Sequence, residues 1–265
     1  MASILSVSRG KIMAYGGLGA PLAMIGYPIA IWIIPFYSEV TKFQLAMLAN
    51  LLLIARFTDV ITDPLIGQWG DTTKTKIGRR KPWIILGVPL MMFSIYRLFN
   101  PGEDVTVTYF LVWMMLMYLG STAIGIPYGA WGAEISSEYH QRSRIVSGRE
   151  AFTLIGLLIS ALIPLGVEVS GEGISLREGF ARTLSAIFLF QDFSTSNQMR
   201  EILRYMGLGI ILLLPIFAAL AIWKVPDPMP EVKKKIPLRE GLRYARENPL
   251  LVRILAIIFL VRELI

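Results

Sequence analysis

Long apolar stretches alternate with short polar segments along the 265 residues of this chain. A helix needs about 20 predominantly apolar residues to cross a bilayer. Six stretches are close to that length, at residues 13–37, 43–67, 82–99, 107–131, 146–167 and 202–223. A seventh begins near Pro249 and stops at Ile265, which is too short to cross. The pattern predicts an all-α membrane protein, with a six-helix transmembrane bundle followed by an incomplete seventh helix.

The segment after the sixth stretch has a different composition. It contains Pro226, Pro228 and Pro230 and then three consecutive lysines, which is typical of a linker. We therefore expect three regions: an N-terminal six-helix bundle at 1–224, a cytoplasmic linker at 225–248 and the start of helix seven at 249–265.

The overall composition supports a membrane protein and argues against an enzyme. Hydrophobic residues make up 54% of the chain and charged residues 17%, whereas about a quarter of a soluble domain is charged. The chain has no cysteine and a single histidine, His140. These counts exclude disulfides, thiolate metal sites and multi-histidine metal sites, and no nucleophile–base constellation is visible. We expect no organic cofactor.

The formal charge of +7 follows a membrane pattern and does not indicate nucleic acid. Lysine and arginine gather in alternate connections, at 70–82, 134–144 and 224–246, while 38–42 and 100–106 have few. Connections rich in these residues face the cytoplasm. The distribution predicts a multi-pass protein of the cell inner membrane with a cytoplasmic N-terminus, and a lipid bilayer as its surroundings.

The second apolar stretch carries charges on one face. Arg56, Asp59 and Asp63 are spaced by three and four residues, so a helix places them together. Each charge at mid-membrane costs about 2.5–3.5 kcal/mol on insertion scales, so this face requires partners. In one interpretation, Arg56 pairs with one aspartate and the other packs at the helix end. In the interpretation we favour, a cation lies between the carboxylates, which otherwise repel each other. Pro64 also leaves the Val60 carbonyl available to a ligand. Such oxygen donors suit Na⁺ or H⁺.

The same stretch and the following loop carry a recognisable motif. Residues 59–67 read Asp-Val-Ile-Thr-Asp-Pro-Leu-Ile-Gly, and residues 78–83 read Gly-Arg-Arg-Lys-Pro-Trp. The motif resembles that of the glycoside–pentoside–hexuronide:cation symporters, a branch of the major facilitator superfamily. The resemblance implies a secondary symporter that moves a sugar or related small solute with Na⁺ or H⁺ by alternating access.

The resemblance also implies roles for individual residues. Asp59 and Asp63 would bind the coupling cation, with help from Thr62 and Thr122. Arg149, on the fifth stretch, matches an arginine that contacts sugar in the family. The alternative for Arg149 is an arginine that snorkels to the membrane interface.

The loop after the second stretch resembles a gate of the superfamily. There Asp71, Gly78, Arg79 and Arg80 would hold the cytoplasmic mouth shut in one state. The alternative is simple anchoring by positive charges on the cytoplasmic side.

Aromatic and small residues give weaker indications. Tyr27 and Tyr128 are candidates to stack on a sugar ring, although scattered membrane aromatics more often pack. Ser121, Gly125 and Gly129 recur every four residues, which predicts close helix approach more than a substrate groove. The glycine-rich segment 16–19 lacks the context of a nucleotide loop and predicts tight packing of the first stretch.

The chain departs from the sugar-binding members of this family at two acidic positions. The first stretch is apolar at 19–23, and Gly125 stands where those members carry an aspartate before Ile-Pro. The cation is therefore better supported than the sugar. A Na⁺-coupled lipid or amphiphile carrier and a non-transporting membrane scaffold remain as alternatives. Because a complete family member has twelve spans, we expect a truncated copy that lacks the C-terminal six-helix half.

Overall fold

The computed structural model describes residues 7–102, 105–172, 175, 178, 196–227 and 248. Its helices are α1 (Arg9–Gly17), α2 (Gly19–Ile31), α3 (Ile33–Thr41), α4 (Leu45–Thr72), α5 (Lys81–Phe99), α6 (Val107–Glu134), α7 (Tyr139–Glu172) and α9 (Ser196–Lys224). Within the described residues, six spans are long and apolar enough to cross a membrane: α1 with α2, then α4, α5, α6, α7 and α9. This confirms the predicted all-α membrane fold. The predicted helix seven, and the predicted linker between residues 228 and 247, lie outside the described residues.

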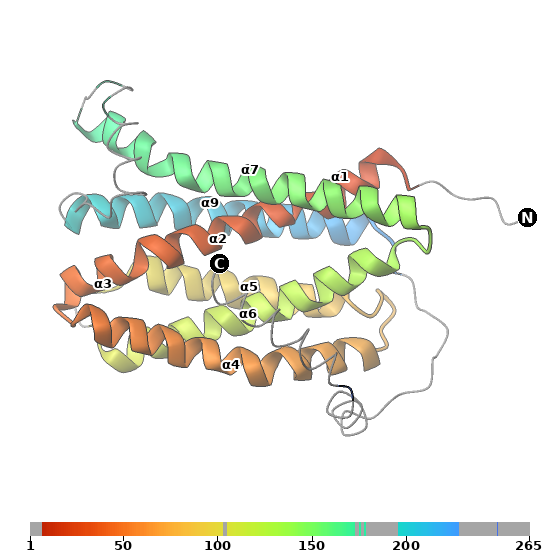
Figure 1. Ribbon diagram of the computed structural model, residues 1–265, viewed down its shortest axis with the longest axis horizontal. Helices are drawn as coiled ribbons and strands as arrows, with labels where there is room; N and C mark the ends of the chain where they lie inside the picture. Colours follow the sequence, from red (N-terminus) through yellow and green to blue (C-terminus); the bar gives the residue numbers. More distant parts are fainter. Residues whose placement is uncertain are drawn as a thin grey trace, which may run out of the picture. The chain divides into compact units, whose positions relative to one another are not determined.

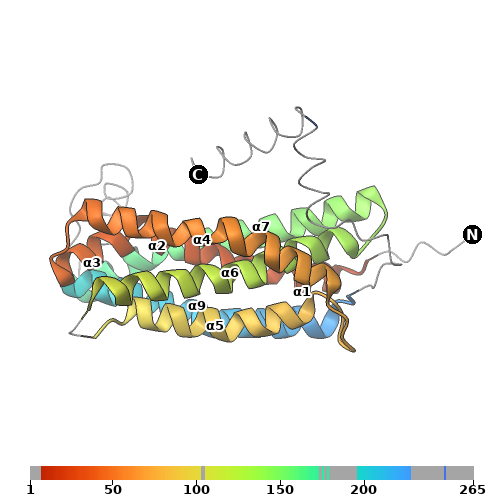
Figure 2. The ribbon, with the colours of Figure 1, turned by 90° about the horizontal axis from the view of Figure 1, so that it is seen from below.

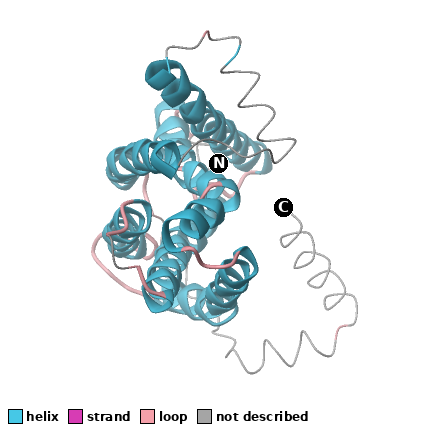
Figure 3. Cartoon of the chain, turned by 90° about the vertical axis from the view of Figure 1, so that its left-hand side faces the viewer, coloured by secondary structure: helices cyan, strands magenta, loops and turns pink. Residues whose placement is uncertain are grey.

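The helices lie side by side and share one long direction (Figure 1). α6 packs against α4 on one side and α5 on the other, and α5 packs against α9. α9 in turn contacts α1 and α2, which pack on α7. Figures 2 and 3 show the same helices from below and end-on. This order places α4 beside α6 at one edge of the group and α7 beside α1 and α2 at another.

Large aromatic side chains fill the space between the helices. Tyr37 is fully buried, lies 4.6 Å from the ring of Phe110, and donates a hydrogen bond to the Leu98 carbonyl at 2.9 Å. Trp131 is fully buried near the other end of α6. Because lipid tails are as apolar as these side chains, their contribution to helix association in a membrane comes from close packing and hydrogen bonds.

The first span is interrupted, and a neighbouring helix supplies one of its missing backbone hydrogen bonds. α1, α2 and α3 follow one another with single-residue breaks at Leu18 and Trp32. Pro28 lacks the N–H that the carbonyl of Met24 would accept in a regular helix. The buried hydroxyl of Ser160 on α7 donates to that carbonyl at 3.2 Å. A neighbouring helix thus supplies the missing hydrogen bond, as a membrane interior requires.

Glycines bring the first span into backbone contact with α7. A Cβ atom on Gly16 would lie 2.8 Å from the carbonyl oxygen of Gly148, and one on Gly156 would lie 2.1 Å from that of Ala20. A side chain at either position is incompatible with this approach. The tight packing predicted for segment 16–19 is confirmed.

The close approach predicted for Ser121, Gly125 and Gly129 is wrong. A Cβ atom on Gly125 or Gly129 would meet nothing within 4 Å among the described atoms. The packed glycines of α6 are Gly120, against the backbone of Met91, and Gly132, against Tyr15. One residue rotates the direction of a side chain by about 100° around a helix, so a regular stripe can face away from the neighbouring helix.

Candidate functional site

The two predicted cation ligands lie on one uninterrupted helix. α4 runs for 28 residues through Asp59, Asp63 and Pro64, so the two carboxylates are one turn apart on the same face. Both residues are half-buried. Because Pro64 has no N–H, the carbonyl of Val60 lacks its usual helical donor.

A neighbouring helix adds a hydroxyl group beside the second aspartate. Thr122 on α6 donates its Oγ1–H to Oδ1 of Asp63 at 2.9 Å, and its side chain is buried. Because α4 and α6 pack along each other, residues 59 positions apart in sequence become neighbours here. The structure therefore brings together Asp63 and Thr122 from separate helices.

Further oxygen atoms on α4 are withdrawn from solvent close to these groups. Oδ1 of Asp59 is buried. The Oγ1 of Thr62 is buried and has no hydrogen-bond partner among the described residues. An unsatisfied buried hydroxyl costs about 1–3 kcal/mol, and a bound cation would remove part of that cost. Carboxylate, hydroxyl and carbonyl oxygens are the donors that hard cations prefer.

The candidate site contains two carboxylates together with neutral hydroxyl and carbonyl oxygens. The described part of the chain holds no group of three or more histidine, cysteine, aspartate or glutamate residues arranged to bind a metal ion.

Arg149 lies on a helix that packs elsewhere in the group. It stands on α7, which packs on α1 and α2, whereas α4 packs on α6. Its Nε and Nη2 lie 3.0 and 2.6 Å from Oε1 of the adjacent Glu150, and 30% of its side chain is exposed. A contact between Arg149 and a solute stays a prediction.

The two candidate tyrosines are placed differently. Tyr128 is buried, and its hydroxyl donates to the carbonyl of Tyr15 at 2.9 Å while the Tyr15 hydroxyl donates back to the Tyr128 carbonyl at the same distance. This reciprocal pair ties α1 to α6 and occupies the Tyr128 hydroxyl. Tyr27 is half-buried on α2. Stacking of either ring on a sugar stays a prediction.

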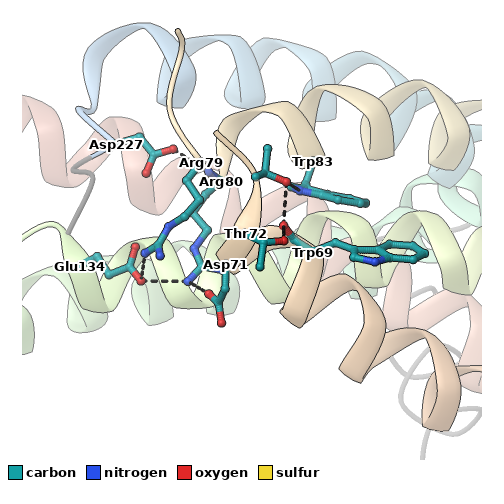
Figure 4. A network of polar contacts seen from close by, with 9 residues as sticks. Trp69, Asp71, Thr72, Arg79, Arg80, Trp83, Glu134 and Asp227 are labelled. Atoms are coloured by element: carbon teal, nitrogen blue, oxygen red, sulfur yellow. Dashed lines mark hydrogen bonds and ion pairs between the residues drawn. The ribbon is translucent and has the colours of Figure 1, made fainter. Parts of the chain in front are cut away.

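The loop between α4 and α5 is tied to the end of α6 by ion pairs, which Figure 4 shows. Nη2 of Arg80 lies 2.5 Å from Oδ1 of Asp71 and 2.9 Å from Oε1 of Glu134. Nη2 of Arg79 lies 2.7 Å from the same Glu134 oxygen. We call Asp71, Arg79, Arg80 and Glu134 the α4–α5 network. Burial opposes the charge of Arg80, but Glu134 and Asp71 more than offset it and raise the pKa of its guanidinium.

A further carboxylate holds the start of α5. Oδ2 of Asp227, which follows α9, accepts hydrogen bonds from the backbone N–H groups of Arg80 at 2.7 Å and Lys81 at 3.4 Å. These donors are left unpaired by the helix itself, and the positive end of the helix dipole favours an anion there. Sequence reasoning did not find Asp227 or the role of Glu134. The available signal was an acidic residue between two prolines, directly after the sixth apolar stretch.

The position of Asp227 explains why residue 78 is a glycine. Gly78 has a φ of +120°, and a Cβ atom there would lie 2.2 Å from Oδ2 of Asp227. We expect Gly78→Ala to lower the free energy of unfolding by about 1–2 kcal/mol, through backbone strain and displacement of the carboxylate. Thermal unfolding of the purified protein measures this loss. Gly102→Ala is the control, because a Cβ atom at Gly102 meets nothing within 4 Å. Equal melting temperatures for both variants would contradict the assignment.

Comparison with known proteins points to membrane transport. Residues 14–264 match the model of a family described as MFS/sugar transport protein. The inner membrane symporter YicJ of Escherichia coli (strain K12) is 26% identical over 244 residues, covering 83% of this chain and 53% of that protein. The putative glycoside/cation symporter YagG of the same organism is 29% identical over 143 residues, covering 52% and 31%. The sodium-dependent lysophosphatidylcholine symporter 1-B of Danio rerio is 27% identical over 164 residues, covering 61% and 31%. The chain therefore spans about half, or less, of the length of these relatives.

Proposed function

This chain belongs to the MFS/sugar transport protein family, and we therefore propose that it forms part of a symporter driven by Na⁺ or H⁺. The family is one of transporters, which agrees with the prediction that the chain is not an enzyme. The observation that carries the proposal is the contact between Thr122 and Asp63, one turn from Asp59, on helices able to cross a membrane. Relatives named as symporters, one of them sodium-dependent, support it.

In the proposed mechanism, the coupling cation binds between Asp59 and Asp63. Its charge relieves the repulsion between the carboxylates, and the hydroxyls of Thr62 and Thr122 complete its oxygen shell. The positive charge lowers the cost of enclosing this face of α4 in an apolar environment. Enclosure of the face is therefore coupled to occupancy by the cation.

The energy available from the cation is sufficient for accumulation of a solute. One charge that moves down a potential of 100 mV supplies about 2.3 kcal/mol. At 1.36 kcal/mol per tenfold change, this supports roughly 50-fold accumulation of a neutral solute. Transporters of this kind hold their sites between two halves, so a second six-helix half would complete the machine in the cell inner membrane.

The first candidate for the transported solute is a sugar or a related small molecule. An amphiphile is a second candidate, favoured by an apolar side chain on the α4 surface beside the aspartates. Val60, three residues before Asp63, is 56% exposed, and it offers a contact to an acyl chain and none to hydroxyl groups. The sodium-dependent lysophosphatidylcholine symporter among the relatives agrees with this candidate.

The α4–α5 network would act as the cytoplasmic gate in this proposal. The basic connections near it support a cytoplasmic location, and hence a cytoplasmic N-terminus. The shared Glu134 oxygen binds two arginines, so its separation from both arginines would break these ion pairs between the loop and α6.

The test is cation-dependent stability of the purified chain. We expect Na⁺ to raise its melting temperature, and a co-transported solute to raise it further only when Na⁺ is present. Thr122→Val removes the hydrogen bond to Asp63 and should weaken apparent Na⁺ affinity about fivefold. Thr108→Val, on the exposed start of the same helix, is the matched control. Stability that depends on neither Na⁺ nor pH, with or without candidate solutes, would instead support the membrane scaffold.

A further inference from the structure

Arg97 lies against two aromatic rings at the opposite end of α5 from the α4–α5 network. It stands in the last turn of α5. That end of α5 lies beside the start of α6 (Figure 2). Its guanidinium carbon lies 5.3 Å from the centre of the Tyr109 ring and 5.5 Å from that of Trp113. Both distances are those of cation–π contacts.

The rings are held in place by contacts of their own. The Tyr109 hydroxyl donates to the backbone carbonyl of Arg97 at 2.6 Å. Trp113 meets Tyr109 at 6.2 Å and Phe93 at 5.1 Å, in both cases edge to face. Thr106 caps the start of α6 by accepting from the backbone N–H of Tyr109 at 3.1 Å. The aromatic groups therefore form a fixed support for the Arg97 side chain.

The charge of Arg97 is not balanced by any carboxylate that the structure describes. Asp71, Glu134 and Glu150 form ion pairs with Arg79, Arg80 and Arg149, and none of these pairs includes Arg97. Arg97 itself is exposed. The guanidinium has five N–H donors, so its contacts with the two rings leave donors available for a planar or tetrahedral oxyanion.

The surroundings of this guanidinium are those of a membrane surface. Arg97 is two residues from the end of a span, and the neighbouring Phe93 and Tyr96 are 57% and 53% exposed. Aromatic side chains concentrate at the level of the lipid headgroups. The oxyanion available at that level is the phosphate of a phospholipid.

We propose that Arg97, supported by Tyr109 and Trp113, binds the phosphate of an anionic phospholipid at the membrane surface. The guanidinium donates hydrogen bonds to the phosphate oxygens, while the exposed rings of Phe93 and Tyr96 contact the glycerol and upper acyl chains. An anionic lipid fits better than a choline lipid, because choline would bring a second cation to the same place. This site lies apart from the cation ligands and does not depend on which solute is transported.

The experiment counts lipids that stay bound to the purified full chain in native mass spectrometry. The probe is phosphatidylglycerol, titrated against detergent-purified protein. We expect Arg97→Gln to weaken its binding roughly fivefold, and Trp113→Leu to weaken it less. Arg144→Gln removes the same charge from an exposed site on α7 and should have little effect. Equal weakening by Arg97→Gln and Arg144→Gln would indicate attraction by net charge and overturn the proposal.

Two further arms test whether Arg97 binds the phosphate group itself. A neutral glycolipid with the same acyl chains contains no phosphate, so its binding should not respond to Arg97→Gln. An equal response would mean that the rings alone bind lipid, which overturns the proposal.

Glu103 and Asp104 follow α5 and lie outside the described residues. The double variant Glu103→Gln with Asp104→Asn therefore tests whether these carboxylates neutralise Arg97. A fivefold gain that requires Arg97 would show that they neutralise it, which also overturns the proposal. If Arg97→Gln does not fold, Arg97→Lys carries the test, because it keeps the charge but loses the planar edge.

Discussion

Replacing Asp59 or Asp63 by asparagine is expected to abolish the stabilisation of this chain by Na⁺. A cation between Asp59 and Asp63 is bound largely by their two negative charges, and each variant removes one of them. At a Na⁺ concentration 100 times the dissociation constant, binding to the folded state alone stabilises by about 2.7 kcal/mol. For a chain of this size that corresponds to a rise in melting temperature of roughly 5–10 °C. Thermal unfolding in Na⁺ and in a large organic cation measures the difference.

The same helix offers a control with the same change of charge. Asp71 is on α4, two turns beyond Asp63, where it is exposed and paired with Arg80. Asp71→Asn should keep the full response to Na⁺. If H⁺ is the coupling ion, Na⁺ has no effect on any form, and the two site variants lose instead a pH dependence that Asp71→Asn retains. A full Na⁺ response in both Asp59→Asn and Asp63→Asn would remove the cation site from consideration.

The arrangement along α4 could be predicted because it depends only on helical spacing. Three and four residues between charges fix a common face in any helix, and the apolar stretch was long enough to identify the helix. Helical spacing could not predict the contact between Thr122 and Asp63, because 59 positions separate them in the sequence. Only the family resemblance suggested Thr122, and the packing of α4 on α6 supplied the contact.

The contacts that sequence reasoning missed depend on where helix ends meet. Glu134 ends α6 and Asp227 follows α9, yet both reach the loop before α5. The sequence around each of these residues does not indicate which residue it contacts. The close helix approach predicted from the spacing of Ser121, Gly125 and Gly129 was wrong for a related reason. Spacing shows that residues share a face, but only the packed neighbours decide which face is in contact.

Inserting a side chain at the contact between α2 and α7 is expected to have the largest effect on stability. Gly156 faces the backbone of Ala20, and a Cβ atom there would lie 2.1 Å from its carbonyl oxygen and 2.8 Å from its Cα atom. Backbone atoms have no alternative rotamer, so in Gly156→Val the two helices must separate. That separation also removes the hydrogen bond from Ser160 to the Met24 carbonyl, which has no other helical donor because of Pro28.

We expect Gly156→Val to lower the free energy of unfolding by about 3 kcal/mol or more, which is the upper end of the cost of overpacking. The melting temperature of the purified chain would fall by roughly 6–12 °C. Gly166→Val is the matched control on the same helix, because Gly166 is exposed and a Cβ atom there meets nothing within 4 Å. Both variants make the same Gly→Val change in helix propensity, so the difference between their melting temperatures isolates the contact between α7 and α2. Similar melting temperatures for the two would mean that α7 does not approach α2 this closely, and the placement of Arg149 beside the first span would have to be revised with it.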